Sequence, residues 1–202
     1  MTTRARSVRT APRPSRPARY RFTVAQYERM GETGILGQDE HVELIKGEVI
    51  RMPPMGRAHR VRVNRITRLF GRTVGDRAIM QVQSSLALGD EHEPEPDVAL
   101  LRWRDDFYET AGPDAGDVLL VVEVSDTSLA YDLETKVPFY AQHLIPEVWD
   151  WDLPNHQVHV FRNPADGSYR ERFIAHPGDA LEVAALPGVR IAVSDVLGPV
   201  PR

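Results

Sequence analysis

The chain has 202 residues, of which 42% are hydrophobic and 27% are charged, and it contains no cysteine. This length suits one domain of ordinary size. The lack of cysteine excludes a disulfide scaffold, a cysteine-ligated zinc or iron–sulfur site and thiol catalysis, so any metal must be held by oxygen or imidazole ligands. The sequence has no long uncharged apolar run, so we expect no membrane span, and a cytoplasmic location fits the cysteine-free composition.

The charge is distributed unevenly along the chain. Residues 1–21 hold seven of the 25 basic residues, all arginines, and no acid. We expect this segment to be a disordered basic arm, followed by a single domain over residues 22–202. An inert tail is the simpler interpretation of the arm, and a contact with phosphates is the alternative. The rest of the chain, with 18 basic and 29 acidic residues, carries a net charge of −11 and is a poor electrostatic match for nucleic acid.

The predicted elements follow from capping residues, periodicity and turn dipeptides. A short helix begins after Thr23, and a second helix spans 57–74 with apolar residues at helical spacing. The dipeptide Lys46-Gly47 predicts a hairpin between strands 42–45 and 48–52. The remaining predictions are strands at 80–88, 98–101, 118–124, 147–153 and 157–162, a helix at 131–144, and hairpin turns at 154–155 and 166–167. Together they predict an α+β fold with a central mixed β-sheet flanked by helices, an N-terminal hairpin and C-terminal hairpins.

Two acidic residues occur where a carboxylate is costly. Glu123 interrupts a strand that is apolar on both faces, so its carboxylate must be protonated, paired or bound to a metal. Asp97 stands directly before the apolar predicted strand 98–101 and ends a run of five acids within the eight residues Asp90–Asp97. Pro94 and Pro96 hold this run extended, and an ideal strand would place its acids from Glu91 to Asp97 on one side, where they repel unless a cation neutralises them.

Lys136 follows Glu123 by thirteen residues, on the helix after the strand. A helix that turns back over the end of its strand can bring this lysine to Glu123. Two carboxylates and a lysine at the ends of adjacent strands suit Mg²⁺, which prefers oxygen ligands and can activate water for attack on phosphorus. A buried structural salt-bridge network of Asp97, Glu123 and Lys136 explains the same residues equally well at this stage.

The order of these residues, with several further motifs, resembles the PD-(D/E)XK nuclease superfamily and, within it, the bacterial Uma-type family of putative restriction endonucleases. The segment Glu43–Glu48 is similar to the E-L-I-x-G-E hairpin of that family, and Glu123-Val124-Ser125 with Asp132, Lys136 and Tyr140 is similar to its E-V-x-S…D…K…Y stretch. Pro146-Glu147-Val148-Trp149 and Asp152 resemble its closing P-E-Y-W…D segment. The resemblance covers roughly residues 22–190.

The resemblance implies a restriction-endonuclease-like core and Mg²⁺-dependent hydrolysis of phosphodiester bonds, with Mn²⁺ as a possible substitute. By position, Asp97 and Glu123 become the metal ligands, Lys136 the catalytic lysine and Glu43 an additional acid of the site. His59 matches a recurring histidine and is assigned, with Arg60, to substrate binding. Arg60 belongs to an arginine-rich helix face (Arg60, Arg62, Arg65, Arg68, Arg72) that either contacts phosphates or is simply solvated.

The sequence therefore favours a metal-dependent DNA endonuclease, and a homodimer would let two such sites cut a duplex. The chain departs from the family pattern at Asp126, where proline is usual, and at Pro138, within the helix of Lys136. Pro138 and the acidic body of the chain favour a second hypothesis. If Pro138 rotates Lys136 away, the chain is a catalytically inactive nuclease-fold protein that binds nucleic acid or serves as an assembly module. A hydrolase of other phosphoesters is a third possibility.

Overall fold

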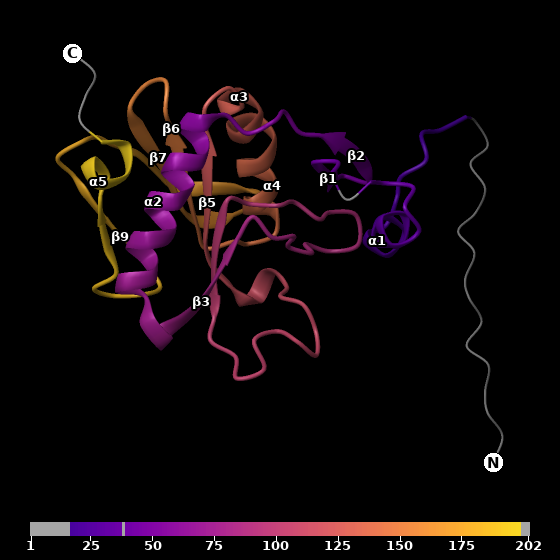
Figure 1. The fold of residues 1–202 in the computed structure, drawn as a ribbon, viewed down its shortest axis with the longest axis horizontal. Helices are drawn as coiled ribbons and strands as arrows, with labels where there is room; N and C mark the ends of the chain where they lie inside the picture. The colour runs from indigo at the N-terminus through magenta and orange to yellow at the C-terminus, as the bar shows by residue number, and fades with distance from the viewer. Residues whose placement is uncertain (1–16, 38, 199–202) are drawn as a thin grey trace.

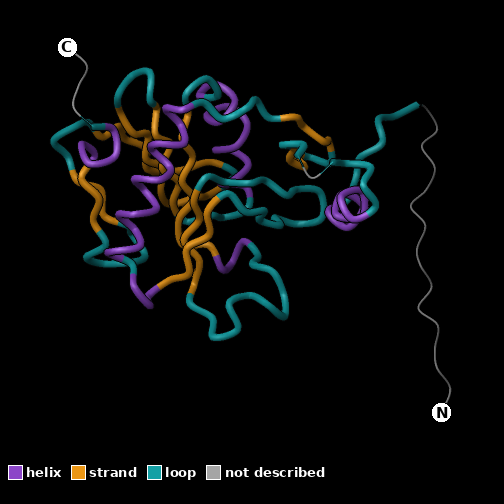
Figure 2. Tube along the Cα trace, in the orientation of Figure 1, coloured by secondary structure: helices purple, strands orange, loops and turns teal. Residues whose placement is uncertain are grey.

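The computed structural model describes residues 17–37 and 39–198, so most of the predicted basic arm lies outside the described residues. A mixed six-stranded sheet in the order β3-β4-β5-β6-β7-β8 forms its centre, and of the pairs in this sheet only β5 and β6 run parallel. Figure 1 shows the helices around this sheet and Figure 2 the strands within it. The elements of the sheet are β3 Ala78–Val82, β4 Val98–Arg102, β5 Val118–Ser125, β6 Glu147–Asp152, β7 Gln157–Ala165 and β8 Ser168–Ala175.

Two apolar clusters cover the two faces of the sheet. On one face, α2 (Arg57–Thr73) packs Val63, Ile66 and Phe70 against β4, β5 and β6, with α5 (Val193–Leu197) beside it. The other face is covered by a helical unit made of α3 (Leu129–Tyr131), one π-helical turn η3 (Asp132–Lys136) and α4 (Val137–Gln142). Because β5 is buried along its whole length, residues on both of its faces are removed from water, as its unbroken apolar run predicts.

A smaller lobe lies to the side of the sheet (Figure 1). It contains α1 (Val24–Glu32) and the hairpin of β1 (Val42–Ile45) and β2 (Glu48–Arg51). Thr23 and Gln26 form a capping box at the start of α1, and Lys46 and Gly47 both have positive φ, as a tight hairpin turn requires. Short elements complete the fold: η1 Gly75–Arg77, η2 Ala115–Asp117, β9 Ala180–Glu182 and β10 Arg190–Ala192.

The α+β class, the mixed sheet and the hairpins are confirmed, but two elements differ from the predictions. The predicted strand 80–88 ends at Val82, because Gln83 takes a left-handed backbone conformation with φ of 47°. The chain beyond it forms an extended arm in which the N–H groups of Leu86 and Leu88 donate to the carbonyls of Pro94 and His92. The predicted helix 131–144 is present, but the π turn interrupts it. Across the part of the chain that the structure describes, no helix is long and apolar enough to cross a membrane.

Candidate functional site

A pocket of about 160 Å³ lies where β5 ends and β4 begins. Because β4 and β5 are antiparallel, with Val98 opposite Val122, Asp97 stands beside the last residues of β5. The hairpin β1–β2, the start of α2 and the turn η3 complete the walls. The pocket therefore brings together Asp97, Glu123, Lys136, Glu43 and His59, which are far apart in the sequence. Arg60, which was predicted to bind substrate, is exposed and does not line the pocket. Its guanidinium donates to the carbonyl of Met55 at 2.7 Å.

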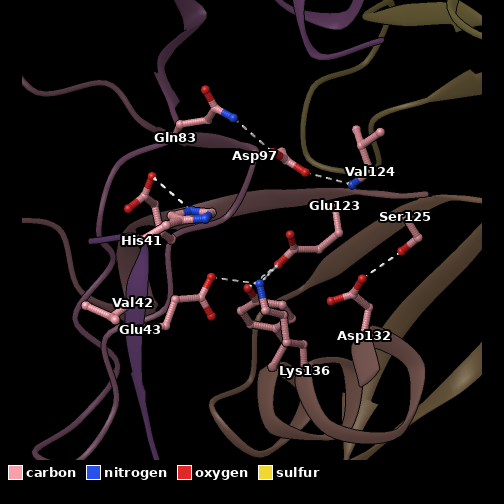
Figure 3. Close-up of polar contacts among 12 residues, drawn as sticks. His41, Val42, Glu43, Gln83, Asp97, Glu123, Val124, Ser125, Asp132 and Lys136 are labelled. Carbon is pink, nitrogen blue, oxygen red and sulfur yellow. Dashed lines mark hydrogen bonds and ion pairs between the residues drawn. The ribbon is translucent and has the colours of Figure 1, made fainter. Parts of the chain in front are cut away.

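Asp97 is fixed by three polar contacts and is only 8% exposed. The main-chain N–H of Val124 donates to Asp97 Oδ2 at 2.9 Å, and His59 Nε2 lies 2.9 Å from the same oxygen. Gln83 Nε2 donates to Oδ1 at 3.3 Å (Figure 3). These contacts fix the carboxylate at the end of β5.

Lys136 lies between two carboxylates in the buried part of the pocket. Its Nζ donates to Glu43 Oε1 at 3.0 Å and to Glu123 Oε1 at 3.3 Å, and all three side chains are at most 5% exposed. Figure 3 shows the three side chains converging from β1, β5 and η3. The ammonium is thus turned toward the acids, which is the arrangement that the nuclease hypothesis requires and also the core of the salt-bridge alternative.

Pro138 does not rotate Lys136 out of the pocket. The π turn ends at Lys136, and the N–H of Val137 donates to the carbonyl of Asp132, five residues back. Pro138 is the second residue of α4, and the backbone of Lys136 and Val137 before it stays in the right-handed helical region. The π turn thereby accommodates the proline and keeps Lys136 facing Glu123, which is consistent with the frequent occurrence of such turns at functional sites.

The electrostatics of the pocket are dominated by acids. Six carboxylates line it among the described residues, and Lys136 is the one lysine or arginine beside them. Burial raises the pKa of Glu123 well above its usual range, against the opposing effect of Lys136. Burial lowers the pKa of Lys136, but the carboxylates of Glu123 and Glu43 outweigh it and raise this pKa above its ordinary value. The lysine is therefore charged at neutral pH, and one positive charge faces several acids.

The donor set fits a hard divalent cation. Glu43 Oε2 is buried without a hydrogen-bond partner among the described residues, so the pocket holds at least one carboxylate oxygen that no protein donor satisfies. Within residues 17–37 and 39–198, no three His, Asp or Glu side chains converge into a ready cage. Mg²⁺ needs no such cage, because it is commonly held by one or two carboxylates together with waters and substrate phosphates.

Comparisons with known proteins show the family of this chain and support its fold. A family model described as "Putative restriction endonuclease", Uma2, matches residues 24–194. The chain belongs to the Uma2 family. A crystal structure of a putative nuclease belonging to DUF820 from Anabaena variabilis superimposes with a TM-score of 0.66 at 14% sequence identity, covering 87% of this chain and 97% of that one, and it supports the fold. A search of curated proteins gives no match.

Asp132 is a site residue to which the sequence assigned no function of its own. It begins η3, is 3% exposed, lines the pocket and accepts a hydrogen bond from Ser125 Oγ at 2.7 Å. Ser125 stands two residues after Glu123 on β5. Asp132 and Lys136 are the first and last residues of the same π-helical turn, so this turn brings both of them to the end of β5.

The acidic run Asp90–Asp97 does not converge on one cation. It is not a strand, and only Glu95 and Asp97 line the pocket. Glu93 instead pairs its backbone with Leu44, and the carbonyl of Glu91 accepts from the N–H of Gly47. The run thus holds the β1–β2 hairpin, and with it Glu43, against the sheet. Of the four acids predicted on one side, Glu95 and Asp97 therefore reach the pocket.

The arginine face of α2 is also divided in the structure. Arg62 and Arg65 donate to the carbonyls of Leu197 and Val196 at 2.9 and 3.0 Å and so bind the C-terminal end of α5. Arg68 and Arg72 are exposed. The alternative in which the whole arginine face contacts phosphates therefore does not hold for Arg62 and Arg65, which instead join α2 to α5.

Asp150 is a buried acid beside the site. It pairs with Glu123 across β5 and β6, is 0% exposed, and neither carboxyl oxygen has a hydrogen-bond partner in the described chain. Burial, with Asp132 nearby, raises its pKa well above the usual range. In the folded protein Asp150 therefore keeps its proton at pH values where the unfolded chain has already lost it. Between the pKa of Asp150 in the unfolded chain and its higher pKa in the folded protein, the free energy of unfolding of the wild type falls as the pH rises.

Replacing Asp150 with asparagine removes this pH-dependent cost. We expect Asp150→Asn to raise the free energy of unfolding by about 1–3 kcal/mol at pH 8 and to change it little near pH 3, below the unfolded pKa, where the carboxyl is largely protonated in both states. Urea unfolding of both proteins at the two pH values measures the difference. A variant less stable than the wild type at pH 8 would contradict the assignment of a neutral, unpaired carboxyl.

Proposed function

We propose that this protein is a Mg²⁺-dependent DNA endonuclease whose active site is the pocket of Asp97, Glu123, Lys136 and Glu43. The observation that carries the proposal is the convergence of two buried carboxylates and a buried, charged lysine at the meeting ends of β4 and β5. Membership of the Uma2 family and the nuclease-like fold support it.

In the proposed reaction, Asp97 and Glu123 are the residues that would hold the cation. When bound, Mg²⁺ would polarise the phosphoryl oxygens and lower the pKa of a bound water. Lys136 remains protonated, so it orients the attacking water and offsets the charge that develops on the phosphate, and it does not act as the base. The water oxygen forms the new bond to phosphorus as the bond to the leaving sugar oxygen breaks, and the proton that the water loses passes through solvent to that leaving oxygen. Glu43 keeps the ammonium in place from the opposite side.

We further propose that His59 contacts Asp97 to set its orientation rather than binding substrate directly. Arg60, exposed near the pocket, remains a candidate for phosphate contact. A homodimer, each chain cutting one strand, and a cytoplasmic location complete the proposal. The second candidate function is a catalytically inactive nuclease-fold protein, which the direct ion pairs of Lys136 with Glu43 and Glu123 favour, because they satisfy the lysine without any metal.

Cleavage of plasmid DNA separates the two functions. We expect the wild type to nick supercoiled plasmid with Mg²⁺ or Mn²⁺ and to stop when the metal is chelated. Asp97→Asn, which keeps the shape of the side chain, is expected to lower the rate by about 10³-fold or more, since it removes a charged metal ligand. Asp114→Asn, at the exposed start of η2, is the matched control and keeps wild-type activity. Equal cleavage by wild type and Asp97→Asn would refute the assignment.

A further inference from the structure

Tyr140 is a buried residue with no part in the proposed reaction. It lies on α4, is 0% exposed, and its hydroxyl donates to Glu123 Oε1 at 2.6 Å, shorter than the 3.3 Å contact of Lys136 with the same oxygen. The ring belongs to the apolar cluster between the helical unit and the sheet. A hydroxyl directed from an apolar cluster onto a candidate metal ligand has a more specific role than filling space.

Lys136 and Tyr140 use up one oxygen of the Glu123 carboxylate. Both donate to Oε1, and a carboxylate oxygen has two lone pairs, so Oε1 has no acceptor capacity left. The two donors are four residues apart on one helical unit, so they lie on the same side of it. Oε2 is the oxygen that remains for a cation.

We propose that Tyr140 is a positioning residue for the metal: by holding Oε1, its hydroxyl keeps the Glu123 carboxylate in the orientation that presents Oε2 to a divalent cation. This inference rests on the proposed function. Burial and the charge of Glu123 raise the pKa of Tyr140, so the hydroxyl keeps its proton and donates throughout the neutral range. Partners of this kind, one step removed from the metal, typically change metal affinity by about 10- to 100-fold.

The chain offers a matched control in Tyr169. It lies on β8, is 4% exposed, belongs to the same apolar cluster, and its hydroxyl donates to the carbonyl of Ile145 at 2.8 Å. Tyr169→Phe therefore removes a buried hydroxyl and one hydrogen bond, as Tyr140→Phe does, but away from the pocket. The stability cost of the two variants should be similar.

The test is calorimetric titration of Mn²⁺ into the wild type and the two variants, with thermal unfolding of each. We expect Tyr140→Phe to weaken Mn²⁺ binding by about 10- to 100-fold and Tyr169→Phe to leave it within about twofold. Plasmid cleavage by Tyr140→Phe should need a correspondingly higher Mg²⁺ concentration and approach the wild-type rate at saturation.

Three other outcomes overturn the inference. Wild-type affinity in Tyr140→Phe removes the positioning role and leaves the proposed function intact. Equal weakening of Mn²⁺ binding in Tyr140→Phe and Tyr169→Phe means that loss of either hydroxyl loosens the apolar cluster as a whole. This result also removes a specific role for Tyr140. Failure of the wild type to bind Mn²⁺ refutes the proposed function, and the inference fails with it.

Discussion

Replacing Lys136 with methionine is expected to lower the free energy of unfolding by about 3–5 kcal/mol at pH 8 and to abolish cleavage. Methionine preserves the length of the side chain but removes the ammonium that contacts Glu43 and Glu123. Each carboxylate then remains buried without its cationic partner, and such uncompensated charge is among the largest single-residue costs in proteins. The attacking water also loses the charge that orients it.

The loss of stability expected in Lys136→Met depends on pH. Because the folded pKa of Lys136 is raised, the wild-type ion pair is at full strength below the unfolded pKa of lysine and is lost only as the pH rises through the folded value. In the variant, the pKa of Glu123, already raised by burial, rises further. The variant is therefore least destabilised near pH 5, where Glu123 can take up a proton, and most destabilised at pH 8.

Urea unfolding at pH 5 and pH 8 measures this effect, and Lys46→Met is the control. Lys46 is the only other lysine of the chain and is exposed in the β1–β2 turn, so its replacement should change stability by less than about 0.5 kcal/mol at either pH. A loss in Lys136→Met that is no larger than in Lys46→Met, or that does not grow with pH, would show that Lys136 does not neutralise the buried acids.

Glu147→Gln is expected to destabilise the fold by about 3–5 kcal/mol without changing metal affinity. Glu147 is 0% exposed, and its two oxygens accept hydrogen bonds of 2.7 Å from Trp149 Nε1, Arg162 Nε and the N–H of Ala184. It thus joins β6 to β7 and to the segment after β9. Glutamine removes the charge opposite Arg162 and turns an amide donor toward one of these donors.

Glu171→Gln tests the same arginine from the surface. The Glu171 carboxylate is 4.0 Å from Arg162 and its side chain is 46% exposed, so its loss should cost less than about 1 kcal/mol. Chemical unfolding gives both costs, and Mn²⁺ titration checks the pocket. Loss of Mn²⁺ binding in folded Glu147→Gln would place this residue in the metal site and would contradict its structural role.

The difference between Glu123 and Glu147 shows how far sequence reasoning reaches. Both are acids in apolar strands, and both belong to motifs of the Uma2 family. The cost of burying charge marks Glu123 from the sequence as needing a partner, but it does not say which partner, and the sequence analysis did not apply it to Glu147, which pairs with Arg162. Only the arrangement of β5, β6 and β7 distinguishes them.

The buried strands β4 and β5 were predictable almost to the residue because their apolar runs have no other placement. The π turn and the contact of Tyr140 with Glu123 were not, because both depend on how the helical unit packs against β5. The hydrogen bonds of Arg62 and Arg65 likewise depend on α5, which lies more than a hundred residues further along the chain. Local pattern cannot encode such distant partners.

Calorimetric titration of Mn²⁺ into the wild type and Asp97→Asn tests the central claim most directly, since it asks whether the acids at the meeting ends of β4 and β5 hold a divalent ion. We expect one bound Mn²⁺ ion per wild-type chain and none in Asp97→Asn under the same conditions. No heat of binding in the wild type, or the same affinity in both proteins, would contradict it and leave a structural salt-bridge network in this pocket.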